Sequence, residues 1–224
     1  MQDLLSKVSI NVNENIYLKS PDSSDLGRRI VVEGIEIIDS RGFENLTFRK
    51  LGQAINSTEA SVYRYFESKH KLLLYLISWY WGWMEYRLVF GLANIESAED
   101  RLGRAVDLFT EQIQEDGEFT YMDVVKLNRI VISESSKSYL TKEVDQENSE
   151  GFFMGYKQLV ERVGNIILEI NPAYKYPHML VSSVIEGAHH ERFFAQHLPR
   201  LTDVVKGVDS IPEFYRELVF KAIK

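Results

Sequence analysis

The chain of 224 residues contains no cysteine, which excludes a disulfide scaffold, a thiolate metal site and a cysteine nucleophile. Proline is scarce, with five residues, and glycines rarely cluster, which favours long helices over many turns. Long hydrophobic runs are also missing. The most apolar stretch, 72–83, contains Ser78 and is too short to span a bilayer, so we expect no membrane segment.

The amino-terminal sequence MQDLLSKVSI has no basic stretch followed by an apolar run, so we expect no secretory signal. The lack of cysteine suits a reducing compartment, and we expect a cytoplasmic protein. Hydrophobic residues make up 45% of the chain and charged residues 26%, which is typical of an ordinary globular protein.

The net charge of −7 argues against a protein that coats nucleic acid. The charge is unevenly distributed along the chain. Residues 26–71 contain eight Lys or Arg and six Asp or Glu, which gives +2, whereas residues 1–25 carry −2 and the remainder carries −7. This weak asymmetry is compatible with one basic face on an acidic protein.

Capping residues predict where the first helices begin and end. Ser23, Ser24 and Asp25 offer capping side chains where an amphipathic helix is predicted to start, and Gly42, which can take positive φ, predicts its end. Ser68 predicts the start of a long helix that runs to about Phe90. The residues before this region, 1–24, lack sustained periodicity, and we expect a flexible amino-terminal arm.

Two short helices are predicted between these longer ones. Thr47 caps the first, and Thr58 caps the second, which runs to about Tyr65. Asn56 lies between them and tolerates the left-handed conformation of a tight turn. A helix, a short turn and a second helix form the geometry that places the second helix in the major groove of DNA.

The rest of the chain has helical periodicity and no competing strand pattern. The polar stretch 133–150 is expected to be a loop. The predicted fold is therefore all-α, with a flexible arm over 1–24, a three-helix helix-turn-helix DNA-binding domain over 25–70, and a helical domain over 71–224. Further helices are expected at about 98–115, 119–133, 149–170, 177–197 and 212–223.

Residues within about 26–76 form one extended motif. They are Gly42-Phe43, Leu46-Thr47, Arg49-Lys50-Leu51, Ser61-Val62-Tyr63-Arg64-Tyr65-Phe66-Glu67-Ser68-Lys69 and Leu72-Leu73. This motif resembles the signature of the TetR family. The resemblance implies an all-helical, dimeric protein that represses transcription until a small molecule binds its carboxy-terminal domain, with double-stranded operator DNA as partner and no cofactor. It thereby implies that residues 71–224 are a ligand-binding and dimerisation domain.

By position, the resemblance implies DNA contacts from both short helices and from the start of the fourth. The implied contacts are Thr47 and Arg49 from the first short helix, Glu59, Ala60 and Ser61 at base edges or nearby phosphates, and Tyr63, Tyr65 and Lys69 at backbone phosphates. The sequence departs from the family pattern at two positions. Asn56 stands in the turn where the family usually has glycine, and Ala60 stands where it often has glycine or proline. Glu59 is a further departure, because an acidic residue is unusual near DNA unless it accepts a hydrogen bond from cytosine.

The fourth helix is rich in aromatic residues that wrap too far round for a single core face. Such a stripe either packs in the core or lines a pocket for an apolar or aromatic ligand. The expected pocket lies between the fourth helix and helices near 98–115, 119–133 and 149–170. Its expected lining is Trp79, Trp83, Tyr86, Phe109, Ile113, Tyr121, Met122, Phe152 and Tyr156.

A two-fold homodimer is expected from the apolar residues of the last two helices, near 177–197 and 212–223. Gly187 and Ala188 are expected to let the helices approach closely. The apolar residues expected to support the interface are Met179, Leu180, Val184, Ile185, Phe193, Phe194, Phe214, Leu218 and Phe220.

Two alternatives remain open. The first is a helical ligand-binding or interaction protein whose helix-turn-helix no longer reads DNA, which the weak positive charge and Glu59 support. The second is a metal-assisted hydrolase, because His190 and His197 share a helix face and Glu186 lies four residues before His190. No nucleophile–base constellation or glycine-rich phosphate loop is present, so we expect neither an enzyme nor a metal site.

Overall fold

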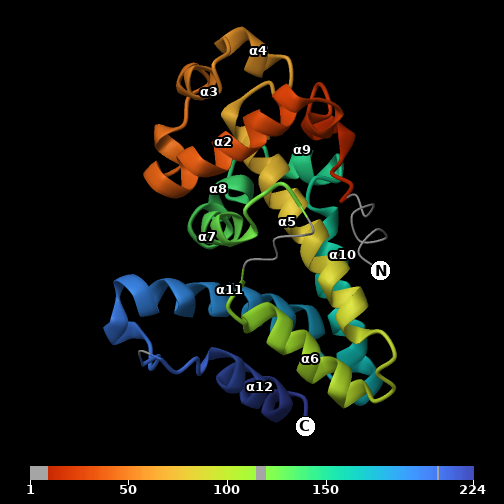
Figure 1. Cartoon of the computed structure of the whole chain (residues 1–224). Coiled ribbons are helices and arrows are strands. Elements are labelled where there is room, and N and C mark those ends of the chain that lie inside the picture. Colours follow the sequence, from red (N-terminus) through yellow and green to blue (C-terminus); the bar gives the residue numbers. More distant parts are fainter. Residues whose placement is uncertain (1–9, 115–119, 206) are drawn as a thin grey trace. The chain divides into compact units, whose positions relative to one another are not determined.

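The protein is helical throughout its described part. The computed structural model describes residues 10–114, 120–205 and 207–224. Within these ranges every regular element is an α-helix or a short 3-10 helix, and no strand is present (Figure 1). The predicted all-α fold class is therefore confirmed.

The chain packs as two compact units. The first comprises the described residues of Met1–Trp83 and Ile113–Met154, and the second those of Met84–Gln112 and Gly155–Lys224. Helix α5 (Lys69–Leu92) is continuous and contributes residues to both. This division follows packing, and the functional boundary near residue 70 stays a prediction.

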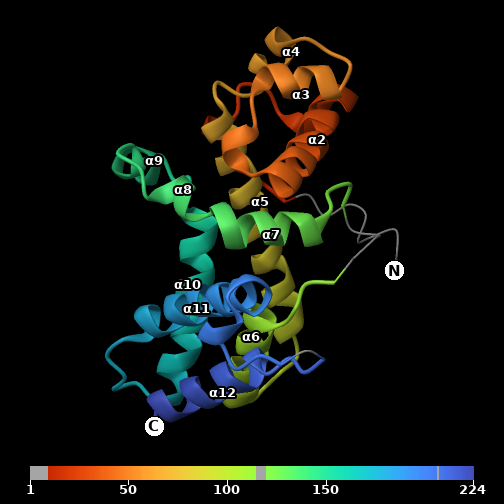
Figure 2. The ribbon, with the colours of Figure 1, turned by 90° about the vertical axis from the view of Figure 1, so that its left-hand side faces the viewer.

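Three helices gather at one end of the first unit (Figure 2). They are α2 (Asp25–Arg41), α3 (Phe48–Ala54) and α4 (Glu59–Tyr63). The Ser24 hydroxyl caps α2 by accepting a hydrogen bond from the Gly27 amide at 3.1 Å, and Gly42 ends the helix with a φ of 78°. Both predicted ends of this helix are confirmed, because each depends on chemistry within a few residues.

Helix α5 is surrounded by the chain where it passes through the first unit. Every residue in 72–83 is buried except two. Gly34 of α2 has no side chain, so the Leu72 side chain of α5 can lie close to the backbone of α2. From the α7 helix (Val124–Glu134), Asn128 donates a hydrogen bond to the Tyr80 hydroxyl at 2.8 Å. A helix that is apolar on all sides is buried on all sides. In this half of α5 the aromatic residues are therefore core residues.

The polar stretch 133–150 differs from the predicted loop. It contains two short helices, α8 (Ser136–Tyr139) and α9 (Val144–Ser149). Ser138 is completely buried and donates to the Ser135 carbonyl at 2.6 Å, and the carboxylate of Glu147 pairs with the His70 ring at 2.9 Å. The prediction was wrong because these polar side chains find hydrogen-bond partners inside the first unit, which the local sequence does not reveal.

The described part of the predicted flexible arm is packed. It forms two 3-10 turns, η1 (Glu14–Ile16) and η2 (Pro21–Ser23), and Ile16 is 1% exposed. Gly27 of α2 makes room for Pro21, because a Cβ at that position would overlap the proline backbone. The expectation of a flexible arm is therefore wrong for residues 10–24. Residues 1–9 lie outside the described residues.

The second unit contains α6 (Ala98–Thr110), most of α10 (Met154–Ile170), α11 (Pro177–His197), η4 (Pro199–Leu201) and α12 (Ile211–Ala222). The five helices predicted after residue 97 correspond to α6, α7, α10, α11 and α12, with ends that differ by about five residues or fewer; positions 115 and 119 lie outside the described residues. Gly187 of α11 lies against the Tyr215 hydroxyl of α12, where a Cβ would overlap it. No described helix has both the length and the apolarity to cross a membrane.

Candidate nucleic-acid interface

A tight turn joins α3 and α4. The Thr47 hydroxyl accepts from the Lys50 amide at 3.2 Å to start α3, and the Thr58 hydroxyl accepts from the Ser61 amide at 3.2 Å to start α4. Asn56 in the turn has a φ of 52°. The predicted caps and the predicted turn are confirmed. The segment is a helix-turn-helix.

Gly52 sets the distance between the two helices of this motif, and the sequence analysis did not identify it. A Cβ at Gly52 would lie 2.9 Å from the carbonyl carbon of Thr58. The Gly52 carbonyl also accepts from the Ser57 amide at 2.7 Å, which closes the turn. The available signal was a glycine inside a helix, where it costs about 1 kcal/mol and so usually has a packing reason.

Five of the eight predicted DNA contacts are exposed on this motif: Thr47, Arg49, Glu59, Ala60 and Tyr63. Tyr63 is 48% exposed, and its ring packs edge-on against Phe48 with 4.8 Å between centroids. This contact orients the tyrosine while its outer part stays accessible to an anion. The five residues are therefore available to a partner, and their contact with DNA is a proposal.

Two predicted contacts differ in the structure. Ser61 is buried, and its hydroxyl is hydrogen-bonded to that of Thr58 at 2.9 Å. Tyr65 is 3% exposed, and its hydroxyl is hydrogen-bonded to that of Ser24 at 2.7 Å. The resemblance implied that both side chains reach DNA from the surface. The surface placement was wrong, because the Ser61 hydroxyl bonds to its own helix cap and Tyr65 is covered by the amino-terminal segment. A contact of either residue with DNA stays an untested prediction.

Lys69, the remaining predicted contact, begins α5. Its ammonium group lies 3.3 Å from the Phe43 carbonyl, 3.5 Å from a Glu44 carboxylate oxygen and 4.5 Å from the centroid of the Phe43 ring. The lysine thus holds the loop between α2 and α3, which contains η3 (Phe43–Asn45). About a third of its side chain stays exposed, so a phosphate contact remains a proposal.

A buried carboxylate holds the same loop from the other side. Glu134 of α7 accepts a hydrogen bond from the Phe43 amide at 3.1 Å. Lys137 of α8 lies 2.8 Å from Glu134 and 3.2 Å from Glu44. Hydrogen bonding to Lys137, followed by the charges of Lys137 and Lys69, holds the pKa of Glu44 below its usual value. The loop between α2 and α3, which precedes the helix-turn-helix, is therefore held by ionic contacts from α5, α7 and α8.

Several cations near the motif have no acidic partner. The side chains of Arg49 and Arg64 form no ion pair within residues 10–114, 120–205 and 207–224, and both are exposed. Arg29, in contrast, pairs with Asp25 at 3.0 Å and donates to the Ile55 carbonyl at 3.1 Å. The exposed surface of α3 and α4 thus has positive charge that the protein itself does not neutralise.

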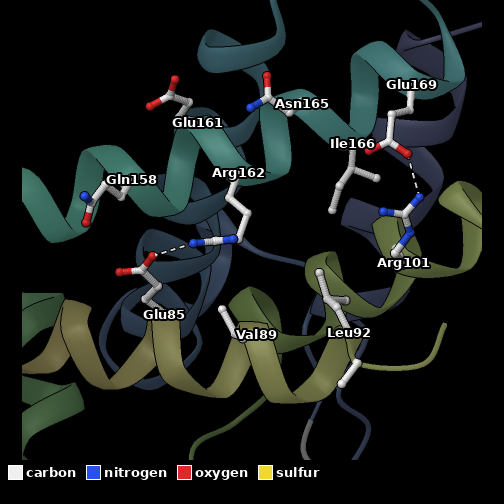
Figure 3. Close-up of a pocket in the computed structure, with 11 residues that line it drawn as sticks. Glu85, Val89, Leu92, Arg101, Gln158, Glu161, Arg162, Asn165, Ile166 and Glu169 are labelled. Atoms are coloured by element: carbon white, nitrogen blue, oxygen red, sulfur yellow. Dashed lines mark hydrogen bonds and ion pairs between the residues drawn. The ribbon is translucent and has the colours of Figure 1, made fainter. Parts of the chain in front are cut away.

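The second unit contains a polar cavity of about 550 Å³ between α5, α6 and α10 (Figure 3). Two ion pairs cross it: Arg162 lies 3.0 Å from Glu85, and Arg101 lies 2.6 Å from Glu169. The apolar part of the lining is Val89, Leu92, Ala93 and Ile166, and the remaining polar residues are Gln158, Glu161 and Asn165. This arrangement suits a molecule with both an apolar part and polar or charged groups.

None of the nine residues expected to line an aromatic ligand pocket belongs to this cavity. Trp79, Trp83, Ile113, Met122 and Phe152 are buried in the first unit, and Phe109 is buried in the second. Tyr121 donates a hydrogen bond to Asp22 at 2.7 Å, Tyr86 packs against Phe90, and Tyr156 donates to Glu186 at 3.1 Å. A ligand site built from these nine stays a proposal.

The residues expected at a dimer interface fall into two groups. Val184 and Ile185 are buried within the second unit, so they pack inside the chain and not against a partner. Gly187, expected to let two chains approach, instead accommodates Tyr215 of the same chain. Met179, Phe193, Phe214 and Leu218 are exposed, while Leu180, Phe194 and Phe220 are half-buried. An exposed apolar surface on α11 and α12 is therefore present.

The histidines of α11 have separate surroundings. His190 packs on the Phe194 ring and His197 on the Phe193 ring, with centroids 5.9 and 4.5 Å apart. His189 is buried; burial, followed by the nearby His190, lowers its pKa to about 4. Within the described part of the chain, no group of three or more His, Asp or Glu side chains is placed to hold a metal ion.

The fold and the geometry of α3 and α4 define a class, the all-helical proteins with an amino-terminal helix-turn-helix. Residues 30–76 match the model of the family described as "Bacterial regulatory proteins, tetR family". The resemblance that residues 26–76 have to this family in the sequence is thereby confirmed. No curated protein matches the chain.

Three solved structures share the fold. FadR from Bacillus subtilis, a transcriptional regulator in complex with stearoyl-CoA, has a TM-score of 0.59 at 14% identity, and the match covers 88% of this chain and 98% of FadR. AibR, in complex with isovaleryl coenzyme A and operator DNA, has a TM-score of 0.57 at 13% identity, with 85% and 97% covered.

The third structure is the ketosteroid transcriptional regulator KstR2 of Mycobacterium tuberculosis. Its TM-score is 0.53 at 12% identity, and the match covers 97% of each chain. At such identities the likeness establishes the fold, which extends over both units.

Proposed function

We propose that the protein is a homodimeric, cytoplasmic transcriptional regulator, most simply a repressor, that binds double-stranded DNA through α4 and is released by a small molecule. One observation carries the DNA-binding part of this proposal. A tetR-family helix-turn-helix presents Glu59, Ala60 and Tyr63 on its second helix, flanked by Arg49 and Arg64, which have no acidic partner in the described chain. The function is one of binding, with no chemical step.

The roles follow from side-chain chemistry. An α-helix fits the major groove, where Glu59 can accept from cytosine and Ala60 can contact a thymine methyl group. Arg49, with its fork of donors, can read guanine, and Thr47 lies beside it. Tyr63 and Lys69 contact phosphates, which position the protein without reading sequence.

The test begins with fragments of the host genome selected for binding to the purified protein. Fluorescence anisotropy with a selected fragment should then show affinity that falls steeply with salt concentration. Arg49→Ala should relax the preference for that fragment, by about 1–3 kcal/mol if a base contact is lost. Tyr63→Ala should weaken binding to all sequences alike. Lys142→Ala, which changes an exposed lysine between α8 and α9, is the matched control.

The alternative is a helical interaction protein that does not bind DNA. It predicts that no fragment is enriched and that Arg49→Ala has no effect. Its support was the weak positive charge and Glu59, but the exposed cations of α3 and α4 favour DNA. Binding with no salt dependence would also contradict our proposal, because phosphate contacts release counterions.

The homodimer rests on the exposed apolar side chains of α11 and α12. Phe214 and Leu218 are 54% and 41% exposed and lie four residues apart on one helix face. A two-fold dimer would cover them and would match a palindromic operator. Phe214→Glu should give a monomer in sedimentation, whereas Leu140→Glu, at an exposed leucine of the first unit, should leave a dimer. A monomeric parent at micromolar concentration would contradict this part.

The small molecule is proposed from the fold and from the second unit. Relatives of this fold are described in complex with acyl-coenzyme A molecules. The candidate sites are the polar cavity between α5, α6 and α10 and the set of aromatic and apolar residues predicted from the sequence. Helix α5 extends from Lys69, at the helix-turn-helix loop, to Leu92, at the cavity, so a ligand that prefers one position of this helix can change DNA affinity.

Thermal melting and tryptophan fluorescence against a panel of amphipathic metabolites test the sensor. A true effector should raise the melting temperature and weaken DNA binding together. Arg162→Ala should abolish the response if the polar cavity is the site, whereas Trp83→Leu should do so if the aromatic set is the site. A panel in which no compound stabilises the protein would remove the sensor from the proposal and leave the DNA-binding part.

A further inference from the structure

The amino-terminal segment contacts the end of the helix-turn-helix at Tyr65. The Leu18 amide donates to the Tyr65 carbonyl at 2.8 Å, and the Ser24 hydroxyl is hydrogen-bonded to the Tyr65 hydroxyl at 2.7 Å. Between these two contacts, the ammonium group of Lys19 lies 5.1 Å from the centroid of the Tyr65 ring. The tyrosine that the family signature places at a phosphate is thus covered by a segment that itself presents a lysine.

This segment is anchored on both sides of Lys19. On one side, Ile16 is 1% exposed and Tyr17 packs edge-on against Tyr75, with 6.0 Å between ring centroids. On the other side, Pro21 is buried and the Asp22 carboxylate accepts from Tyr121 at 2.7 Å. The backbone of Lys19 is therefore held in place. Positioning its side chain at a partner costs less conformational entropy than it would in a loose arm.

The charge of Lys19 is available to an anion. Its side chain is exposed and has no acidic partner in the part of the chain that the structure describes. The nearby Asp22 is engaged by Tyr121 and Tyr75. Arg64, at the end of α4, is exposed and likewise lacks an acidic partner. Two cations therefore lie next to the last turn of the helix that we assign to the major groove.

The electrostatics of Tyr65 agree with this placement. Its pKa is held below the usual value, first by the hydrogen bond to Ser24, which outweighs the opposing effect of burial, and then by Lys19 and Arg64. Both cations therefore act on the same hydroxyl. Because the hydroxyl is bound and buried, the anion nearest to it is expected to contact the lysine and not the tyrosine.

We propose that Lys19 contacts a DNA phosphate at the end of the recognition helix, and that Tyr65 is a positioning residue that supports it. This inference rests on the proposed DNA-binding function. It extends the binding surface beyond the helix-turn-helix to residues 16–24. It also replaces the direct phosphate contact that the sequence predicts for Tyr65.

The experiment measures the affinity of the full chain for a selected genomic fragment between 50 and 200 mM salt. Each phosphate contact contributes about 0.9 to the slope of log affinity against log salt. Lys19→Gln, which retains much of the aliphatic stem, should lower the magnitude of the slope by about 0.9 and weaken binding about fivefold at 0.15 M salt. The loss should be the same for unrelated sequences. Lys19→Arg should retain both slope and affinity.

Tyr65→Phe separates the two roles. It retains the ring beneath Lys19 and removes the hydroxyl, so it should bind with the slope of the parent. The same salt series with Lys142→Ala controls for loss of a lysine elsewhere in the first unit. Thermal melting of each variant shows whether folding is retained. If Lys19 had only a structural role, its replacement would not lower the magnitude of the salt slope by the amount expected for one phosphate contact, about 0.9.

Either of two results overturns the inference. In the first, Lys19→Gln binds DNA with the same salt slope as the parent. In the second, Tyr65→Phe itself lowers the magnitude of the salt slope by about 0.9. The second result would restore the direct tyrosine contact. A parent that binds no DNA fragment would overturn the proposed function and this inference together. A parent that binds, with Arg49→Ala impaired and Lys19→Gln normal, would overturn the inference alone.

Discussion

The helix-turn-helix and the second unit differ in how their positively charged side chains are paired with carboxylates. On α3, α4 and the segment beside them, Lys19, Arg49 and Arg64 are exposed and have no acidic partner in the described residues. In the second unit most arginines face a carboxylate: Arg87 with Glu111, Arg101 with Glu169, Arg162 with Glu85, Arg192 with Asp209 and Arg216 with Asp107.

Exposed ion pairs contribute about 0–1 kcal/mol each, so the pairing in the second unit does little for stability. Its main consequence is a neutralised surface. The unpaired cations of the first unit instead leave a local positive potential on a protein whose net charge is −7. Total charge is therefore a poor guide to an anionic partner, because the pairing of individual side chains decides which charge is available.

The largest expected effect is a loss of stability at low pH, caused by His189, which burial in the second unit keeps uncharged. His189 has a pKa of about 4 in the folded protein, against an ordinary value of 6.5. Between these values the unfolded chain binds the extra proton, so stability is complete above pH 6.5 and falls as the pH drops towards 4, by up to about 3 kcal/mol. Urea unfolding across this range measures the loss.

A His189→Leu variant should lose most of that pH dependence, whereas His190→Asn, at the exposed neighbour, should retain it. If the free energy of unfolding depends on pH equally in the parent and in His189→Leu, another group titrates and burial of His189 does not cause the loss of stability.

The next effect breaks the helix-turn-helix without touching its charges. Gly52→Val would force a side chain against the backbone of Thr58, and overpacking of this kind costs about 2 kcal/mol. The melting temperature should fall, and DNA binding should fall with it because α4 is displaced. Gln53→Ala, at an exposed neighbour, should behave as the parent. A Gly52→Val protein that melts and binds normally would contradict the close packing of α3 and α4.

A smaller effect is expected at the ionic contacts that hold the loop before α3. Glu134→Ala leaves the Phe43 amide without its carboxylate acceptor, which should cost about 1.5 kcal/mol. Hydrogen exchange at this amide should accelerate, while amides in α12 should be unaffected. Glu134→Gln retains an oxygen acceptor and should lose less. Equal protection of the Phe43 amide in all three proteins would show that Glu134 does not hold the loop.

The smallest effect concerns the paired charges themselves. Arg162 pairs with Glu85 at 3.0 Å, and about half of its side chain is exposed. Arg162→Ala should therefore change the free energy of unfolding by less than about 1 kcal/mol and leave DNA affinity in the absence of ligand unchanged. Arg49→Ala should do the reverse, with stability unchanged and DNA binding impaired. Similar effects on DNA binding from both variants would erase the contrast between the two regions.

Much of the fold was predictable because helix ends are local. Ser24, Thr47 and Thr58 each accept a hydrogen bond from an amide three residues ahead, and Asn56 has the positive φ expected of the turn. Helical periodicity indicated the longer helices. The packed segment 10–24 was missed because its anchors, such as Tyr65 and Gly27, lie outside it in the sequence.

The candidate site was predicted in part. The family resemblance placed Thr47, Arg49 and Tyr63 at the DNA, and all three are exposed in the structure. Gly52 was overlooked because its role depends on how closely α4 approaches. The polar cavity of the second unit could not be predicted, since residues 85–93, 101 and 158–169 show no common motif and meet only when three helices pack.

The all-helical class and the helix-turn-helix can be recognised in the sequence, because caps, turns and periodicity act over three or four residues. The burial of Tyr65, the exposed position of Lys19 beside it and the pairing of individual arginines follow instead from tertiary packing. The hydroxyls of Ser24 and Tyr65 meet across 41 residues of chain. Contacts over such separations depend on the packing of whole helices, which no short pattern encodes.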